Sequence, residues 1–236
     1  MMEDCRRALS SLDTEELQNL GIRCQNFSGS EDNIVLVSEG MVSRRGLEIN
    51  FSGARNEIDL RGTQLPGGRL SIVGNEGTVS IDADSEVIID AYVYNRARLL
   101  IEKPRAIFGL WASITEGTAL SVGPGALFAE GVKIFTSDHH SVIDLNTGQQ
   151  INFPGDVNVE SDVWIASDVT VLKNVTIGEG SVVGARSVVT RSIPPTELWS
   201  GHPARCLRQR VSWVPSHPAE PSQVEHMMAN LSLLAN

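Results

Sequence analysis

The sequence predicts an all-β fold, a parallel β-helix in which short strands wind into a solenoid. Three observations lead to this prediction. Residues 157–192 repeat with a period of six, looser units of about 20 residues repeat between positions 47 and 81, and β-branched runs alternate with Gly, Asn and Asp turns after about residue 33. A period of six fits neither an α-helix nor a β-hairpin meander, but it suits three short strands per coil joined by tight turns.

The hexads of residues 157–192 are the strongest evidence for a parallel β-helix. They read VNVESD VWIASD VTVLKN VTIGEG SVVGAR SVVTRS. We expect the side chain at the third position of each hexad to point inward and to stack on the same position one coil above, with neighbouring coils about 4.8 Å apart. That position is β-branched throughout: Val159, Ile165, Val171, Ile177, Val183 and Val189.

An earlier coil is readable over residues 122–139, where Val122, Phe128 and Ile134 take the inward position. The period then breaks. Residues 140–156 are polar and rich in turn-forming residues, and a loop of this length is expected to be expelled from the stack of coils. Such loops often carry function, so this interruption is where an active site is expected.

Both ends of the chain differ from the repeats. Residues 3–20 predict a short amphipathic helix that stops at Gly21, because four leucines fall near helical spacing: Leu9, Leu12, Leu17 and Leu20. The tail beyond the repeats is typical of a docked helix or of a disordered end. The predicted division of the chain is an N-terminal helical segment (1–30), a β-helix (31–210) and a C-terminal tail (211–236).

Composition and charge disfavour several classes of protein. The 236 residues carry a formal net charge of −10, which disfavours binding to nucleic-acid phosphates and to anionic membrane surfaces. Cys5, Cys24 and Cys206 are widely spaced and form no CxxC pair, which argues against a disulfide scaffold and a thiolate zinc site. No apolar leader and no long apolar run are visible, so the sequence predicts a cytoplasmic protein without a membrane span.

Three motifs accompany the hexads: Thr136-Ser-Asp-His-His-Ser-Val-Ile-Asp-Leu-Asn-Thr-Gly-Gln-Gln-Ile-Asn, Asp162-Val-Trp-Ile and Gly201-His-Pro-Ala-Arg. Together with the repeats, they resemble the hexapeptide-repeat acyltransferase family, and in particular the bacterial polysaccharide and sialic-acid O-acetyltransferases, over roughly residues 115–208. The resemblance implies a left-handed β-helix that assembles as a homotrimer, with active sites between subunits. It also implies acetyl-CoA as the acyl donor.

His139 is the candidate general base. Acyl transfer from a thioester to a hydroxyl group needs a base that takes the hydroxyl proton, and imidazole has a suitable pKa near neutrality. From the residues alone, a solvent-facing loop histidine is an equal alternative; in the resembling family, the histidine of this motif is the base. His140 and Asp144 are candidate substrate-contacting residues on the same loop.

The resemblance also implies a donor site. The matching Trp lines the donor and acceptor sites in the family, so Trp164 is a candidate there, with packing in a subunit interface as its alternative. Guanidinium groups suit the phosphates of coenzyme A because they bind them bidentately. The positions that match the cofactor-binding residues of the family are Trp164, Ala166, Ala185, Thr190, Arg191 and Arg205.

Two positions, one in the donor site and one in the Gly201-His-Pro-Ala-Arg motif, depart from the family pattern. Ala166 stands where the family commonly has Gly, and His202 stands where it commonly has Asn. Arg208 lies close to Arg205 in the sequence but is expected to be a solvated surface charge.

Metal chemistry is not expected, because the histidines form no spaced triplet within the coils. The predicted function is acetyl-CoA-dependent O-acetylation of a sugar hydroxyl, on a surface polysaccharide or its precursor, by direct transfer in a ternary complex with His139 as base. Two alternatives stay open. One is N-acetylation of an amino-sugar nucleotide by the same base and donor, and the other is a non-catalytic β-helix scaffold.

Overall fold

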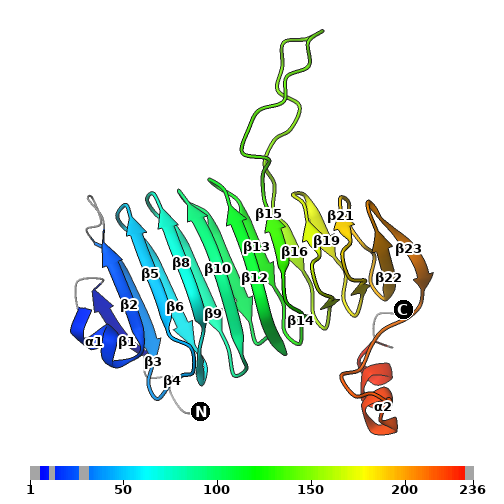
Figure 1. The fold of residues 1–236 in the computed structure, drawn as a ribbon, viewed down its shortest axis with the longest axis horizontal. Coiled ribbons are helices and arrows are strands. Elements are labelled where there is room, and N and C mark those ends of the chain that lie inside the picture. Colours follow the sequence, from blue (N-terminus) through cyan, green and yellow to red (C-terminus); the bar gives the residue numbers. More distant parts are fainter. Residues whose placement is uncertain (1–5, 11–13, 27–31, 232–236) are drawn as a thin grey trace.

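The computed structural model describes residues 6–10, 14–26 and 32–231, and it shows an elongated solenoid (Figure 1). Successive coils lie side by side along the long axis, and the chain advances steadily from one end of the stack to the other. Strands of neighbouring coils pair in parallel along the body of the stack. The parallel β-helix predicted from the sequence is therefore confirmed.

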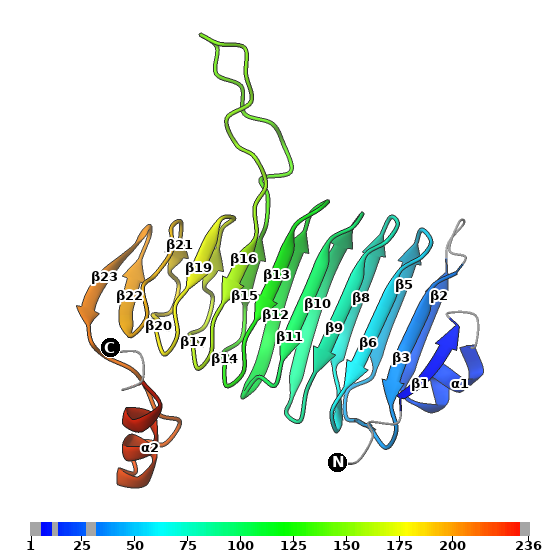
Figure 2. The ribbon, with the colours of Figure 1, turned by 180° about the vertical axis from the view of Figure 1, so that it is seen from behind.

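Two main sheets form the long faces, and Figure 2 shows them from behind. The eight-stranded sheet contains, in spatial order, β1 (Arg6–Ser10), β3 (Ile34–Ser38), β6 (Glu57–Arg61), β9 (Thr78–Asp82), β11 (Arg98–Glu102), β13 (Ala119–Val122), β16 (Val157–Val159) and β19 (Val175–Ile177). The thirteen-stranded sheet contains β2 (Ile22–Asn26), β5 (Leu47–Ser52), β8 (Gly67–Val73), β10 (Val87–Tyr94), β12 (Ala106–Ile114), β14 (Leu127–Phe128), β15 (Val132–Phe135), β17 (Trp164–Ile165), β18 (Thr170–Val171), β20 (Val182–Val183), β21 (Val188–Val189), β22 (Glu197–Gly201) and β23 (Ala204–Gln209). A small sheet pairs β4 (Val42–Ser43) with β7 (Gln64–Leu65), and the helices in the described ranges are α1 (Thr14–Asn19) and α2 (Pro221–Leu231).

The core is a column of stacked apolar side chains along the axis of the solenoid. All the third-position residues of the hexads are 0% exposed, so the inward stacking predicted from the period of six is confirmed. Larger side chains fill earlier coils, and Phe51 and Phe128 are among the largest that are fully buried. Burial of this apolar column is the main source of stability, since short strands and turns have little stability of their own.

The coil changes its cross-section at β12. Ala106 and Ile107 pair with β14, whereas Leu110 to Ser113 pair with β15, so one long strand lies beside two short ones. After β12, the coils turn tight corners, as the hexads require. Up to and including β12 the thirteen-stranded sheet is broad and continuous, with eight residues in β10 and nine in β12.

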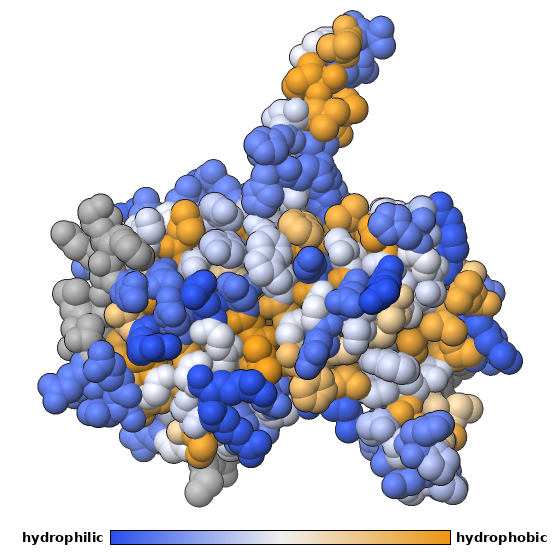
Figure 3. Space-filling model, viewed as in Figure 1, coloured by the Kyte–Doolittle hydropathy of each residue, from blue (hydrophilic) through white to orange (hydrophobic). Residues whose placement is uncertain are grey.

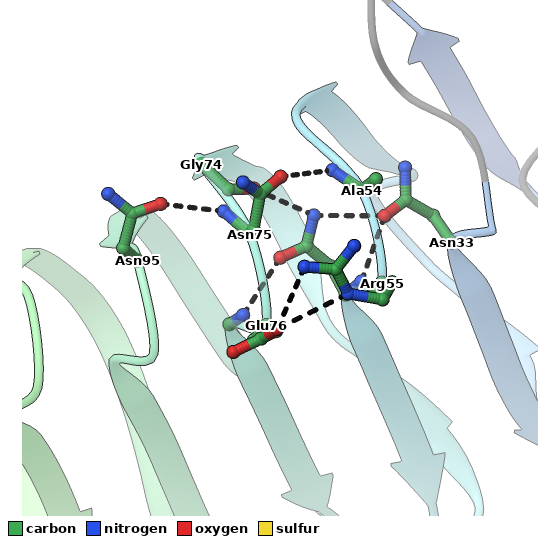
Figure 4. Close-up of polar contacts among 9 residues, drawn as sticks. Asn33, Ala54, Arg55, Gly74, Asn75, Glu76 and Asn95 are labelled. Carbon is green, nitrogen blue, oxygen red and sulfur yellow. Dashed lines mark hydrogen bonds and ion pairs between the residues drawn. The ribbon is translucent and has the colours of Figure 1, made fainter.

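Asparagine side chains form a ladder at one corner of the N-terminal coils (Figure 4). Asn33 Oδ1 accepts hydrogen bonds from the backbone and side-chain amides of Asn56, at 3.0 and 2.9 Å. The Oδ1 of Asn56 accepts in turn from the Gly77 amide at 2.8 Å, and Asn95 Oδ1 accepts from the Asn75 amide at 2.7 Å. Each of these turn amides thus finds an acceptor one coil away, which removes the cost of leaving it unpaired.

The N-terminal end differs from the helix predicted over residues 3–20. The helix is limited to α1, and β1 is a strand that pairs antiparallel with β3. The first coil would otherwise leave a row of unpaired backbone groups, and a strand that covers this edge outweighs the helical spacing of the leucines. Strand β2 already belongs to the thirteen-stranded sheet, so the solenoid begins before residue 31. Residues 1–5 and 11–13 lie outside the described residues.

A hairpin closes the C-terminal end of the stack. β22 pairs antiparallel with β23, and α2 follows beside the last coils, at the corner opposite the projecting hairpin seen in Figure 1. No residue of α2 is buried. Across the described part of the chain, no helix combines the length and the apolar character that crossing a membrane requires.

Replacement of Asn56 by Ala should destabilise the fold. Asn56 is 2% exposed, and its loss leaves the Gly77 amide and the Gly74 carbonyl without this partner. The free energy of unfolding, measured with urea, should fall by about 2–4 kcal/mol, because each buried group left unpaired costs about 1–3 kcal/mol. Asn158→Ala, on the outer face of β16, is the matched control and should change it by less than about 0.5 kcal/mol. Equal losses in both variants would contradict the role of the ladder.

Candidate active site

An arm interrupts the coil after β15. Leu120 pairs with Val157, and Val157 pairs with Val175, so the coil that carries the interruption is about twice as long as the next one. The extra chain, residues 136–156, leaves the body as a narrow projecting hairpin (Figures 1 and 2); we call it the arm. The loop predicted at residues 140–156 is therefore expelled from the stack, as expected.

The root of the arm is fixed by threonines that continue the corner ladder. Thr136 is 0% exposed; its Oγ1 accepts a hydrogen bond from the Thr115 amide at 2.9 Å and shares one with Thr118 Oγ1 at 2.7 Å. The Thr136 carbonyl accepts from the Gly155 amide at 2.9 Å, which closes the neck of the arm. On the returning side, the Asp156 carboxylate accepts from the first amide of β13 at 2.8 Å. The arm therefore leaves the body from a firmly bonded corner.

His139 lies where the arm leaves the body. Its backbone adopts a left-handed conformation, with φ of 59°, which is uncommon for a non-glycine residue. The Ser137 hydroxyl supports this conformation by accepting a hydrogen bond from the His139 amide at 3.0 Å. His139 Nε2 shares a hydrogen bond of 2.9 Å with Ser113 Oγ, and the Tyr94 ring meets the imidazole edge to face with centroids 6.1 Å apart. These contacts fix the direction of the imidazole ring.

Asp138 ties the arm to the following coil. Its carboxylate forms an ion pair with Lys173 and accepts a hydrogen bond from Asn152 Nδ2 at 2.7 Å. Lys173 first, and then Asn152, hold the pKa of Asp138 below its usual range, so the carboxylate is ionised at neutral pH. Asn152 Nδ2 also donates to the His140 carbonyl at 2.8 Å. The two strands of the arm are thereby held together beside His139.

His139 and His140 line a cavity of about 320 Å³ at this corner. A polar hollow of this size suits one small polar ligand. Asp144 lies near the tip of the arm and does not line the cavity. The other lining residues come from the earlier coils and from the arm: Tyr94, Asn95, Thr115, Glu116, Ser137, Asp138, Ser141, Gln150, Asn152 and Pro154.

The residues that hold His139 were not found from the sequence. Ser113 and Tyr94 belong to earlier coils and are far from His139 along the chain. They lie beside the arm because the coils stack. Only the register of the strands, which a single sequence does not provide in this degenerate half, could have identified them.

Trp164 lies on β17 and outside the cavity of His139. It is 37% exposed, and its ring centroid lies 5.8 Å from that of Trp213. Trp213 belongs to the segment that leads to α2, and its Nε1 donates to the Asp162 carbonyl at 2.6 Å. Burial of its carboxyl group raises the pKa of Asp162. The C-terminal segment therefore covers part of Trp164, which the sequence did not indicate.

Three other candidate donor residues occupy two corners of the C-terminal coils. Ala166 and Ala185 lie in the turns that follow β17 and β20, which stack in register. Thr190 is exposed after β21, on the corner from which the arm projects. None of the three lines the cavity of His139.

The two candidate arginines lie towards the end of the solenoid. The Arg191 guanidinium is 5.2 Å from the centre of the Trp199 ring, a cation–π arrangement. Arg205 is exposed in β23, and its Nη1 donates to the Ala204 carbonyl at 2.9 Å. Both guanidinium groups are thus placed on the surface of the last coils, and neither lines the cavity of His139.

The two thiols in the described residues are not poised as nucleophiles. Burial raises the pKa of Cys24 to about 11. Loss of hydration, and then the neighbouring Glu197 carboxylate, raise the pKa of Cys206. A thiol with a raised pKa stays protonated near neutrality. In the same ranges, no group of three or more His, Cys, Asp or Glu side chains is arranged to hold a metal ion.

A protein-family model matches the C-terminal coils. Residues 156–191 match the family model described as bacterial transferase hexapeptide (six repeats). The coils of this segment are therefore similar to transferase hexapeptide repeats. The resemblance seen in the sequence is thus confirmed over this segment. Among curated proteins, a sequence comparison found no match.

Two solved structures share the fold over most of the chain. The polySia specific acetyltransferase NeuO is 20% identical with a TM-score of 0.74, and the match covers 88% of this chain and 93% of that one. The polysialic acid O-acetyltransferase OatWY is 23% identical with a TM-score of 0.73, covering 85% and 98%. At these identities the similarity establishes the fold, a left-handed parallel β-helix. The match includes the N-terminal coils, to which the sequence motifs do not extend.

The contact between Asp138 and Lys173 should make the arm sensitive to acid. Because the pKa of Asp138 is lowered in the folded state, the contact is fully present above the ordinary carboxyl pKa of about 3.9. The contact is lost as the pH falls through the pKa that Asp138 has in the folded protein, which lies below the ordinary carboxyl pKa. Hydrogen exchange, corrected for intrinsic rates, should show the Val142 amide losing protection in that range, since it bonds to Asn152. Asp138→Asn should remove the acid transition, and an unchanged transition would contradict this role.

Proposed function

We propose that the protein is an acetyl-CoA-dependent O-acetyltransferase that acts on a sugar hydroxyl, on a surface polysaccharide or its precursor. The observation that carries the proposal is the position of His139. It is oriented by Ser113 and Tyr94 in a cavity at the root of the arm, directly before the coils that match transferase hexapeptide repeats. The similar structures NeuO and OatWY are described as acetyltransferases of polysialic acid, which supports a saccharide as acceptor.

In the proposed reaction, the acceptor hydroxyl lies in the cavity beside His139. The imidazole takes the hydroxyl proton while the oxygen attacks the thioester carbonyl of the donor. The tetrahedral oxyanion then collapses and the carbon–sulfur bond breaks. The imidazolium returns its proton to the departing thiolate, so the acetyl group passes directly from donor to acceptor and no acyl-enzyme forms.

Ser113 and Asp138 are positioning residues in this scheme. Ser113 Oγ holds the imidazole through Nε2, and the direction of that hydrogen bond sets the tautomer. Lys173 keeps the Asp138 carboxylate ionised. The negative charge of Asp138 attracts the imidazolium of His139 that forms during transfer. Tyr94 packs against the ring and limits its rotation.

We place the donor along the C-terminal coils. Small side chains in the turns allow the pantetheine arm to approach the backbone, and exposed guanidinium groups at the last coils suit its phosphates. Trp164, partly covered by Trp213, provides a flat wall where donor and acceptor meet. The residues assigned to the donor site are Trp164, Ala166, Ala185, Thr190, Arg191 and Arg205.

A homotrimer with active sites between subunits completes the proposal. Apolar side chains gather on the arm, which stands clear of the body (Figure 3). Their exposed fractions lie between 46% and 94%: Val142, Ile143, Leu145, Ile151 and Phe153. Such a concentration is typical of contact with another chain. Trp164 does not line the cavity of His139 in one chain, and in this proposal the tryptophan of a neighbouring subunit faces His139.

His139→Ala should reduce acetyl transfer by about 10²–10⁴-fold, because it removes the base. The measurement is thiol release from acetyl-CoA with neutral, amino and sialic-acid-containing saccharides as acceptors. Binding of acetyl-CoA, measured by calorimetry, and the molar mass should be retained. His217→Ala, exposed in the tail, is the matched control and should keep wild-type turnover.

Three other results of these measurements would each contradict a different part of the proposed function. Unchanged turnover in His139→Ala would remove His139 as the base. Transfer to amino groups alone would replace O-acetylation by N-acetylation. A wild-type protein that neither binds acetyl-CoA nor releases thiol would be a scaffold.

Substitutions of Arg205 and Arg208 test the proposed donor site, with Arg208 as the matched control. Both lie in β23 and are exposed, but only Arg205 belongs to the Gly201-His-Pro-Ala-Arg motif. Arg205→Gln should raise the KM for acetyl-CoA by about 5–10-fold at unchanged kcat, because it removes a charge-assisted hydrogen bond to phosphate. Arg208→Gln should leave the KM close to that of the wild type. Equal effects of the two substitutions would contradict the assignment of Arg205.

A further inference from the structure

A second hollow lies on the outer face of the thirteen-stranded sheet, in the N-terminal half of the solenoid. It has a volume of about 480 Å³ and crosses β8, β10 and β12; we call it the sheet groove. The strand register aligns a column of outward-facing side chains along it: Arg23, Glu48, Arg69, Asp90, Trp111 and Lys133.

Glycines lie along the sheet groove. Gly46, Gly68, Gly109 and Gly131 line it, and a Cβ atom at any of the last three would meet the neighbouring coil. Gly68 has φ of 108°, and a Cβ atom there would clash with the Ile89 carbonyl oxygen. A side chain cannot be added at that point without distorting the strand.

The sheet groove is rich in cationic groups, although the whole chain has a formal net charge of −10. Arg69 pairs with Glu48 at 3.3 Å, but its side chain stays 46% exposed, so its guanidinium retains N–H groups for a ligand. Arg45 pairs with Glu86 at 2.8 Å and its side chain stays 60% exposed. With Glu86 included, four cationic groups face three carboxylates, and this small excess of positive charge favours an anionic ligand. The charged side chains that line the groove are Arg23, Arg45, Arg69 and Lys133, with the carboxylates of Glu48 and Asp90.

Aromatic rings connect the sheet groove to the corner at which His139 lies. Trp111 lines the groove, and its ring centroid lies 6.0 Å from that of Tyr92 and 5.1 Å from that of Phe135. All three rings are half-buried, so part of each remains open to a ligand. Two residues further along β12, on the same face, Ser113 holds His139. The rings therefore form a continuous path from the groove to the proposed base.

We propose that the sheet groove is a binding subsite for the acceptor chain, and that it holds carboxylate-bearing sugar units remote from the hydroxyl that reacts at His139. This inference rests on the O-acetyltransferase function proposed above. Arg69 on β8 and Lys133 on β15 are three strand spacings apart, about 14 Å, which exceeds the length of a single sugar ring. An oligosaccharide that crosses the strands packs its rings on Trp111 and Tyr92 and directs its carboxylates to the cationic side chains.

Transfer kinetics with acceptors of graded length test this subsite. The acceptors are acidic oligosaccharides of increasing length and the same oligosaccharides with their carboxylates converted to amides. Trp111→Ala and Arg69→Gln should each raise the KM for the longest acidic acceptor by about tenfold. The kcat, the KM for acetyl-CoA and the KM for the shortest reactive acceptor should stay unchanged. With wild-type protein, amidation of the longest acceptor should raise its KM to a similar degree.

Arg98→Gln is the matched control. Arg98 is an exposed arginine on β11, in the opposite sheet, so its replacement removes the same charge away from the sheet groove. It should leave the KM for the longest acidic acceptor unchanged. Equal losses for short and long acceptors, or no loss in Trp111→Ala and Arg69→Gln, would overturn the subsite. A changed molar mass in those variants would instead identify this face as a subunit interface.

Direct binding separates this inference from the proposed function. Equilibrium dialysis without acetyl-CoA measures the affinity of wild type and variants for the longest acidic oligosaccharide. If the wild type binds it, the two groove variants do not, and no acetyl transfer occurs, the sheet groove is a site for acidic oligosaccharides and the transferase proposal fails. If transfer occurs without dependence on Trp111 or Arg69, the transferase proposal stands and the subsite fails.

Discussion

Backbone pairing between successive coils is the interaction on which the rest of this structure depends. It sets each residue about 4.8 Å from its counterparts in the neighbouring coils. Equivalent positions in successive coils therefore have similar surroundings and favour side chains of similar size and polarity. β-branched residues fill the interior under this constraint, and Asn33 and Asn56 satisfy the corner amides under the same constraint. An insertion is tolerated at a corner because it interrupts no strand there, and Thr136 supplies the polar contacts that keep that corner closed.

The same constraint decides what the sequence could and could not predict. The hexads recur at a fixed spacing, so Val159 and Ile177 indicate stacked coils without reference to the rest of the chain, and His139 draws attention because it stands where that spacing breaks. β1 could not be predicted, because its residues take part in a helical pattern and form a strand only beside the open edge of β3. Ser113 and Trp213 depend on which coil stacks on which and on where the tail lies, and neither is encoded in local spacing.

The change of cross-section at β12 separates two kinds of surface. The C-terminal coils turn tight corners with small residues such as Ala166 and Ala185, which leave the backbone accessible. The N-terminal coils form a broad sheet whose outward side chains are free of the packing that fixes the inward ones. In the proposed function, the first surface binds the donor through its chain and phosphates, and the second binds the acceptor through its sugars. His139 lies at the corner between the two surfaces, which is the position that this proposal assigns to the base.

Net charge is a poor guide to the ligand of so elongated a molecule. At physiological ionic strength, exposed charges separated by more than about 8 Å are largely screened from one another, and sheets packed face to face already lie about 10 Å apart. Acidic residues on the opposite sheet therefore act weakly on the sheet groove, whereas Arg69 and Lys133 line it directly. A formal charge of −10 disfavours partners that cover much of the surface, such as nucleic acid or a membrane. It does not disfavour an acidic chain that contacts one groove.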